Sequence, residues 1–126
     1  MEGYSAKIAY ASKELSTKER IAIKDTTACV SLDEATADTT LDLDYSYHVI
    51  LDVHNEKSDN KDYRKTVLVT KTGERYVTGS DAFTNSLTDI VNEMTEAGEG
   101  DNITIRVYRK ESKNFKGKTF ITCAII

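Results

Sequence analysis

The stretch LDLDYSYHVILDVH, residues 41–54, carries the strongest strand pattern in the first half of the chain. Apolar and polar side chains alternate along it, as in a β-strand with one buried face. Its length predicts a curved strand that continues round the corner of a barrel. Tyr45 and Tyr47 are expected in the core, because they share a face with the leucines. One face holds Leu41, Leu43, Tyr45, Tyr47, Val49, Leu51 and Val53, and the other holds Asp42, Asp44, Ser46, His48, Ile50, Asp52 and His54.

The residues that follow predict a hairpin and then one helix. Two strands, residues 63–70 and 75–78, flank a tight turn. Ser80 is a favourable N-cap, and Asp81 suits the first helical turn. Apolar residues then recur at helical spacing and predict about four turns that pack on the core. The stripe consists of Phe83, Leu87, Ile90, Val91 and Met94, and Gly98 and Gly100 end the helix.

The end of the chain predicts a second hairpin. Residues 103–110 and 119–126 form its strands, and residues 111–118 form the loop between them. The first strand alternates, so its two faces differ in character. Ile103, Ile105 and Val107 point to the core, whereas Thr104, Arg106, Tyr108 and Lys110 point outward.

The first forty residues give weaker patterns. Residues 4–10 predict a short strand, and residues 12–20 a loop or a short helical turn. Residues 21–30 weakly predict a second strand, and the acidic residues 31–40 predict an exposed connection. The chain is therefore expected to be a single domain, residues 1–126, of the mainly β class. An OB-fold-like five-stranded barrel, with one helix between the middle and last hairpins, fits this order of elements best.

Positive charge is concentrated in the closing hairpin. Residues 106–118 contain six cations and one anion, a net charge of +5, whereas the whole chain carries −4. Tyr108 and Phe115 lie among these cations. Cations and flat rings together are what single-stranded nucleic acid requires, for its phosphates and its bases. The alternative is a solvated hairpin whose lysines only protect a strand edge from aggregation.

Other chemistry is not indicated. A metal site from His48, Asp52 and His54 is conceivable, but a solvated polar face is the favoured interpretation, and no cofactor or metal is expected. Cys29 and Cys123 are expected to be reduced thiols that pack as small apolar side chains. There is no acid–base constellation, so we expect a protein that is not an enzyme. No apolar run is long enough to span a bilayer, and the first residues do not predict a secretory signal.

Three stretches of the chain resemble the small single-stranded DNA-binding proteins of lactococcal and related phages of Gram-positive bacteria. They are VHNEKS (residues 53–58), YVTGSDAF (residues 76–83) and SKNFKGKTFITC (residues 112–123), and the likeness runs from about Ser12 onward. The resemblance implies an OB-fold, sequence-independent binding of single-stranded DNA in phage replication or recombination, and a homo-oligomer, with a dimer favoured. It also implies a place in the host cytoplasm and contact with phage or host replication and recombination proteins.

The resemblance raises one expectation that the residues do not match. Bacterial proteins of this function typically end in an acidic, flexible tail that recruits partners. Here the residues after Phe120 are those of a strand. If partners are recruited in that way, another surface is expected to serve, such as the acidic residues 33–44.

The predicted binding site combines the closing hairpin with the middle one. Cations of both are expected to neutralise phosphates, and Tyr108 and Phe115 to stack on bases; Phe120 is ambiguous. The rival interpretation is a small phage protein–protein or virion-associated module that uses the same barrel. The candidate residues are Arg106, Tyr108, Lys110, Lys113, Asn114, Phe115, Lys116, Lys118, Arg64, Lys65, Arg75 and Tyr76.

Overall fold

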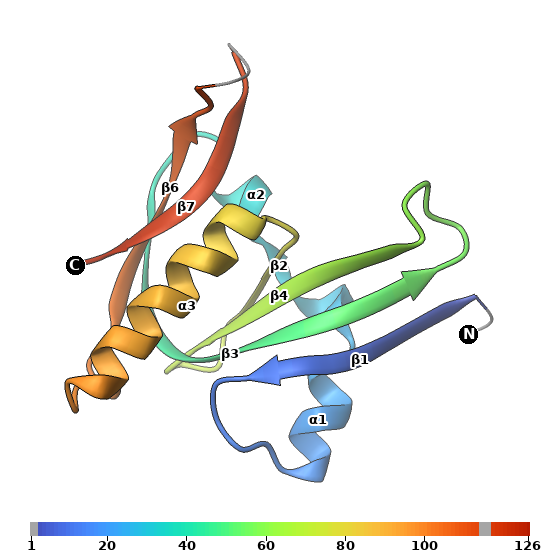
Figure 1. The fold of residues 1–126 in the computed structure, drawn as a ribbon, viewed down its shortest axis with the longest axis horizontal. Coiled ribbons are helices and arrows are strands. Elements are labelled where there is room, and N and C mark those ends of the chain that lie inside the picture. Colours follow the sequence, from blue (N-terminus) through green and yellow to red (C-terminus); the bar gives the residue numbers. More distant parts are fainter. Residues whose placement is uncertain (1–2, 114–116) are drawn as a thin grey trace.

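The fold is a mixed β-sheet that curls into a half-barrel, with a helix before its last two strands (Figure 1). The structure is a computed structural model, and it describes residues 3–113 and 117–126. Its elements are β1 (Tyr4–Ala11), α1 (Thr17–Ile23), the short 3-10 helix η1 (Thr26–Ala28), β2 (Val30–Ser31), α2 (Leu32–Ala35), β3 (Leu41–Asn55), β4 (Asp62–Thr70), β5 (Arg75–Thr78), α3 (Asp81–Glu96), β6 (Thr104–Glu111) and β7 (Thr119–Ile125).

The long strand β3 organises the sheet, as its sequence predicts. The strand order is β2-β5-β4-β3-β6-β7, and β1 also pairs with β3. From Tyr45 to His54, β3 pairs with β4. Its residues 41–44 pair with β6, and residues 49–55 pair with β1. The strand thus belongs to two parts of the sheet, and the chain bends where it passes from one to the other.

The bend corrects the prediction for His48. The pairing of β3 with β4 shifts between Tyr45 and Tyr47, which changes the alternation of side chains at that point. His48 is therefore fully buried, not part of a solvated face, while Asp52 on the same strand stays exposed. Tyr45 is buried as expected, and Tyr47 is partly buried under the ammonium group of Lys13, 4.3 Å from the ring centre.

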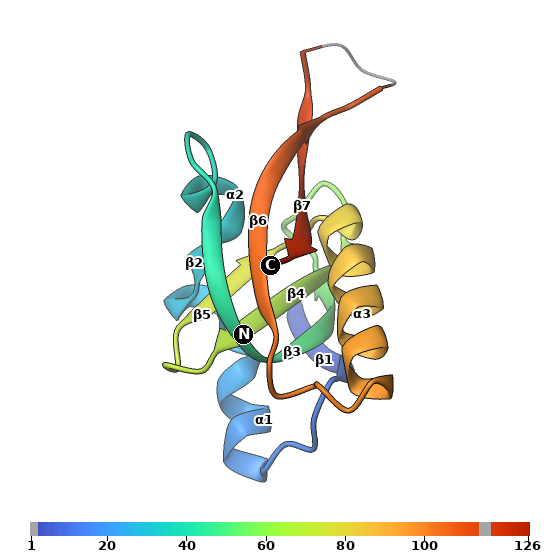
Figure 2. The same ribbon diagram turned by 90° about the vertical axis from the view of Figure 1, so that its left-hand side faces the viewer.

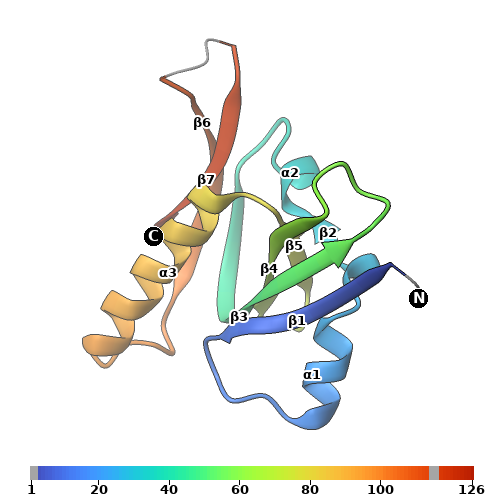
Figure 3. The ribbon, with the colours of Figure 1, turned by 45° about the vertical axis from the view of Figure 1, so that its right-hand side comes forward.

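Two hydrophobic clusters pack against the half-barrel. The first gathers the apolar side of α3, including Phe83 and Leu87, against β6 and β7. The second gathers Val49, Leu51 and Val67 against Ile23 of α1. Figure 3 shows α1 below β1 and β3, away from α3. Ser80 caps α3 by accepting from the backbone N–H of Phe83, which confirms the predicted cap and helix. The pairing of β4 with β5 and of β6 with β7 confirms both predicted hairpins.

The N-terminal predictions are partly wrong. Residues 21–30 do not form one strand: α1 runs to Ile23, and only Val30 and Ser31 pair, in parallel with β5. A capping box formed by Ser16 and Glu19 explains why the helix begins at residue 17. Residues 31–40 are not a simple exposed connection either, because Leu32 and Thr36 are buried. The described sheet has seven strands, not five, and α3 is not the only helix.

The closing hairpin extends beyond the rest of the fold. In Figures 1 and 2, β6 and β7 rise past α2 and α3 toward the tip. We call residues 108–113 and 117–120 the basic arm; they follow Val107, the last fully buried residue of β6. In the described part of the chain, no helix has the length and apolar character needed to cross a membrane.

Candidate nucleic-acid interface

The outer face of the basic arm brings cationic and aromatic side chains together. Across the two strands, Tyr108 pairs with Thr122, and Lys110 pairs with Phe120. Tyr108 and Phe120 are therefore diagonal neighbours on one face, within reach of each other's rings. Both are partly exposed, and Lys110 is exposed. Among the described residues, none of these three side chains has a hydrogen-bond, ion-pair or ring partner, so all three are available to a ligand.

Arg106 lies on the same face but is already paired. Its Nε and Nη2 donate to the two carboxylate oxygens of Asp42, at 2.8 and 3.1 Å. This hydrogen bond lowers the pKa of Asp42 and raises that of Arg106. Asp42 thus offsets most of the positive charge that Arg106 would offer a phosphate. Because both side chains are about half exposed, the pair stabilises the fold only weakly.

Arg109 faces the opposite side and has a structural role. Its Nη2 donates to the backbone oxygen of Asp33 at 2.6 Å, and its Nε to that of Thr36 at 3.2 Å. Its Nη1 donates to Thr119 Oγ1 at 3.1 Å. One guanidinium group therefore ties both strands of the arm to the α2 segment. Two of the cations counted in the sequence, Arg106 and Arg109, are thus engaged within the fold.

Replacing Arg109 by lysine should loosen the root of the arm. Lysine keeps the positive charge, but its ammonium group cannot make all three hydrogen bonds of the planar guanidinium group. We expect the free energy of unfolding to fall by about 1–3 kcal/mol, the usual cost of losing hydrogen bonds from a charged group. Urea unfolding measures it. The control is Lys110→Gln, at an unpartnered neighbour, which should change stability by less than about 0.5 kcal/mol; equal effects of the two variants would refute this role for Arg109.

The cations predicted on the middle hairpin do not form one track. Arg64 Nε donates to Asp52 at 2.8 Å, on the face of the sheet that also carries Ile50 and Thr66. Lys65 lies on the other face, 3.4 Å from Thr26 Oγ1. Arg75 donates to the backbone oxygen of Ala22. The ring of Tyr76 is only 8% exposed and packs in the core.

These positions correct the predicted extension of the site. Neighbouring residues of a strand point to opposite faces, so Arg64 and Lys65 cannot serve the same surface. Tyr76 is not placed to stack on a base. The arm therefore stands alone as the candidate interface.

The tip of the arm is only partly described. Asn114, Phe115 and Lys116, three of the predicted contacts, lie outside the described residues. Lys113 and Lys118, on either side of them, are both exposed. The sequence leaves the orientation of Phe120 open, and the observed register, with Thr119 opposite Glu111, places Phe120 opposite Lys110 on the outer face.

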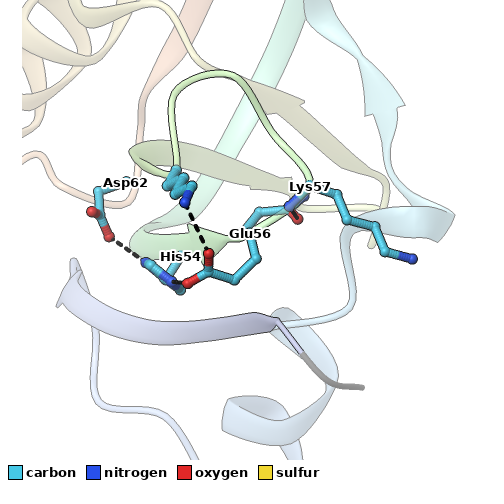
Figure 4. Close-up of polar contacts among 6 residues, drawn as sticks. His54, Glu56, Lys57 and Asp62 are labelled. Atoms are coloured by element: carbon cyan, nitrogen blue, oxygen red, sulfur yellow. Dashed lines mark hydrogen bonds and ion pairs between the residues drawn. The ribbon is translucent and has the colours of Figure 1, made fainter.

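A second polar cluster surrounds His54 at the end of β3 (Figure 4). Its Nδ1 is 2.7 Å from Asp62 Oδ1, and its Nε2 is 2.6 Å from Glu56 Oε1. Asp62 first, and then Glu56, raises the pKa of His54. Lys61 also pairs with Glu56, whereas Lys57 points away from the cluster. The described residues include no group of three or more His, Cys, Asp or Glu side chains suited to a metal ion.

A third polar cluster is buried at the bend of β3. The Tyr45 hydroxyl donates to Ser12 Oγ at 2.7 Å and lies 2.7 Å from His48 Nδ1. Ser12 Oγ also accepts from the backbone N–H of His48 at 2.9 Å. Nε2 of His48 is the one buried side-chain nitrogen or oxygen of the described residues without a partner. Burial lowers the pKa of His48 to about 4, so the ring is neutral at pH 7.

Comparisons of this chain with protein-family models, with curated proteins and with solved structures find no significant match. The geometry of the arm and the resemblance noted above are therefore what a functional assignment has to rest on.

Proposed function

We propose that this protein binds single-stranded DNA without sequence specificity through the outer face of the basic arm. The observation that carries the proposal is the group formed by the partly exposed Tyr108 and Phe120 and the exposed Lys110 on one face of a projecting hairpin. Lys113 and Lys118 add positive charge toward the tip. In this proposal the rings stack on bases and the lysines neutralise phosphates. The protein acts as a binding protein and not as an enzyme.

The chemistry of the arm suits an unpaired strand better than a duplex. Bases are accessible for stacking only where they are unpaired, and every base presents a π-face, so stacking tolerates any sequence. Neither arginine of the closing hairpin is free to read base edges, because Arg106 and Arg109 are both engaged. Binding should therefore depend on strandedness and salt, and little on sequence.

We further propose that residues 41–125 are an OB-fold-like barrel to which the N-terminal elements have been added. The supporting observation is β3, which pairs with β4 along one part and with β6 along another. The helix α3 between β5 and β6 fits the same arrangement. β2 occupies the edge of β5, where it extends the sheet by one short parallel pair.

The biological setting is proposed from the resemblance alone. It places the protein in phage DNA replication or recombination, in the host cytoplasm, as a homo-oligomer. Phage or host replication and recombination proteins would be its partners. The alternative, a protein–protein or virion-associated module, would use the basic arm against an acidic partner.

A salt titration tests the proposal. We expect labelled oligo-dT to bind at low salt, with log K falling by about 2–3 per tenfold rise in salt, as for three or four phosphates on a single strand. Mixed-sequence single strands should bind with similar affinity, and duplex of equal length more weakly. No binding at low salt would contradict the proposal and favour the protein-partner alternative.

A further inference from the structure

A polar groove lies on the other flank of α3 from the arm. It has a volume of about 420 Å³ and runs between α3 and the face of β3 and β4 that carries Ile50 and Thr66. Ile50 and Thr66 contribute to the sheet side, and Asp81, Asn85, Asp89 and Asn92 to the helix side. Thr84 bonds to Thr66 at 2.6 Å on this flank, whereas Ser86 bonds to Thr122 of β7 at 3.0 Å on the other. Groove and arm are therefore separate surfaces of one molecule.

The groove presents polar groups that the fold leaves unused. Among the described residues, the side chains of Asp81, Asn85, Asp89 and Asn92 form no hydrogen bond or ion pair. Arg64, the cation at the edge of the groove, is paired with Asp52. The unpaired charge facing the groove is therefore negative. An acidic groove with free amide and carboxylate oxygens fits a ligand that supplies several N–H donors and positive charge.

The wider sequence strengthens this charge pattern. Residues 79–102, which contain α3, hold six acidic residues and no lysine or arginine. The arm is the opposite: Lys110 and Lys113 are exposed cations that contact no described carboxylate. One molecule thus carries the positively charged basic arm and, on a separate surface, the acidic groove. In Figures 1 and 2 the arm points away from the body, so it does not lie over its own groove.

We infer that the groove between α3 and the β3–β4 face is the docking site for the basic arm of a second copy of this chain. The lysines of one arm lie against Asp81 and Asp89 of the next molecule, and the amides of Asn85 and Asn92 accept the remaining donors. Each arm in this assembly reaches a different neighbour, so the contact is head-to-tail and leaves a free arm and a free groove at the ends. Molecules then add one after another, in place of the closed dimer that the resemblance implies.

This contact should be sensitive to salt, since it joins exposed charges. At about 0.1 M salt the screening length is about 10 Å, and it shortens as the salt concentration rises, so that the attraction between exposed charges weakens. In about 20 mM salt, light scattering without DNA should show a mean mass that keeps rising with protein concentration, starting from 14.1 kDa. In about 0.5 M salt the mass should return to that of one chain.

Two complementary variants test the contact without using DNA. The groove variant is Asp81→Asn with Asp89→Asn, and the arm variant is Lys110→Gln with Lys113→Gln. Each alone should remain a single chain at low salt, because it lacks one half of the contact. An equimolar mixture should form pairs of one copy each and stop there, since only one intact arm and one intact groove remain. Asp38→Asn with Asp59→Asn has the same net charge as the groove variant, and it should self-associate like the unaltered protein.

The outcomes are distinct. A single-chain mass for the unaltered protein at low salt, or variants that still associate alone, would overturn the inference. So would a mixture that forms no pairs, or a loss of association in the control with Asp38 and Asp59 replaced. Thermal unfolding of each variant checks that it is folded. The light-scattering result does not depend on the proposed DNA binding, because no DNA is present, although both contacts use the arm lysines. The oligo-dT titration measures DNA binding separately.

Discussion

Replacing Tyr108 and Phe120 together by alanine is expected to weaken binding to oligo-dT by about 2–6 kcal/mol, because stacking contributes about 1–3 kcal/mol per base. The two rings are diagonal neighbours on the outer face of the arm, so neighbouring bases can use both. Each single variant should show about half of the loss. Fluorescence anisotropy at one fixed salt concentration measures the affinities.

The controls separate stacking from charge and from folding. Tyr108→Phe with Phe120→Tyr keeps both rings and should bind nearly as well as the unaltered protein. Lys110→Gln removes one phosphate contact, so it should lower affinity less than either ring deletion and should reduce the salt slope by roughly 0.7. Lys24→Gln, at an exposed lysine outside the arm, should change neither the affinity nor the salt slope. Unchanged affinity in the double alanine variant would remove the rings from the binding site.

Acid should destabilise the fold through His48, by about 2 kcal/mol at pH 5 and about 3 kcal/mol at pH 4 relative to pH 7. The pKa of His48 is lowered from 6.5 to about 4 in the folded chain, because the ring is buried. The unfolded chain therefore takes up a proton first as the pH falls below 6.5. Stability is lost as the pH falls from 6.5 to about 4, and the loss levels off below about pH 4.

Other titrating groups act outside this window or in the opposite direction. The carboxyl groups of Asp42 and Glu56 have lowered pKa values, so their contribution is complete above their ordinary pKa values and is lost as the pH falls from there through the lowered values. The pKa of His54 is raised, so its contribution is complete below pH 6.5 and is lost as the pH rises through the raised value. Neither effect weakens the fold between pH 6.5 and pH 5.

His48→Gln isolates the contribution of the buried ring. Glutamine does not titrate, and its amide N–H can still donate to the Tyr45 hydroxyl oxygen, although it fills the site less well. It should be less stable than the unaltered protein at pH 7 but lose much less on going to pH 5. Urea unfolding at both pH values measures the difference. An equal loss in both proteins would show that His48 is not the acid-sensitive group.

Local patterns predicted most of the elements from β3 onward. Residues 41–54 alternate over many positions, and Ser80 with the apolar stripe from Phe83 marks a helix that begins with a cap. These signals are contained in neighbouring residues, so they need no tertiary information. Before β3, the short strand predicted over residues 4–10 is confirmed as β1, but residues 21–40 lacked such a signal. There, Leu32 is buried in one cluster with residues of β5 and α3 far along the chain, which no short window reveals.

The sequence by itself determined the long strand, the two hairpins, the capped helix and the concentration of cations near the end of the chain, because each follows from the order of residues along a few turns or strand positions. Only the tertiary structure decided which of those cations are free. Arg106 meets Asp42, Arg109 meets the backbone of Asp33 and Thr36, and Tyr76 enters the core. Such pairings join residues that are more than thirty positions apart, and the bend of β3 that turns His48 inward depends on pairing with β4. The neighbours of a side chain in space, and not its neighbours in sequence, decide whether its charge is paired and how exposed it is.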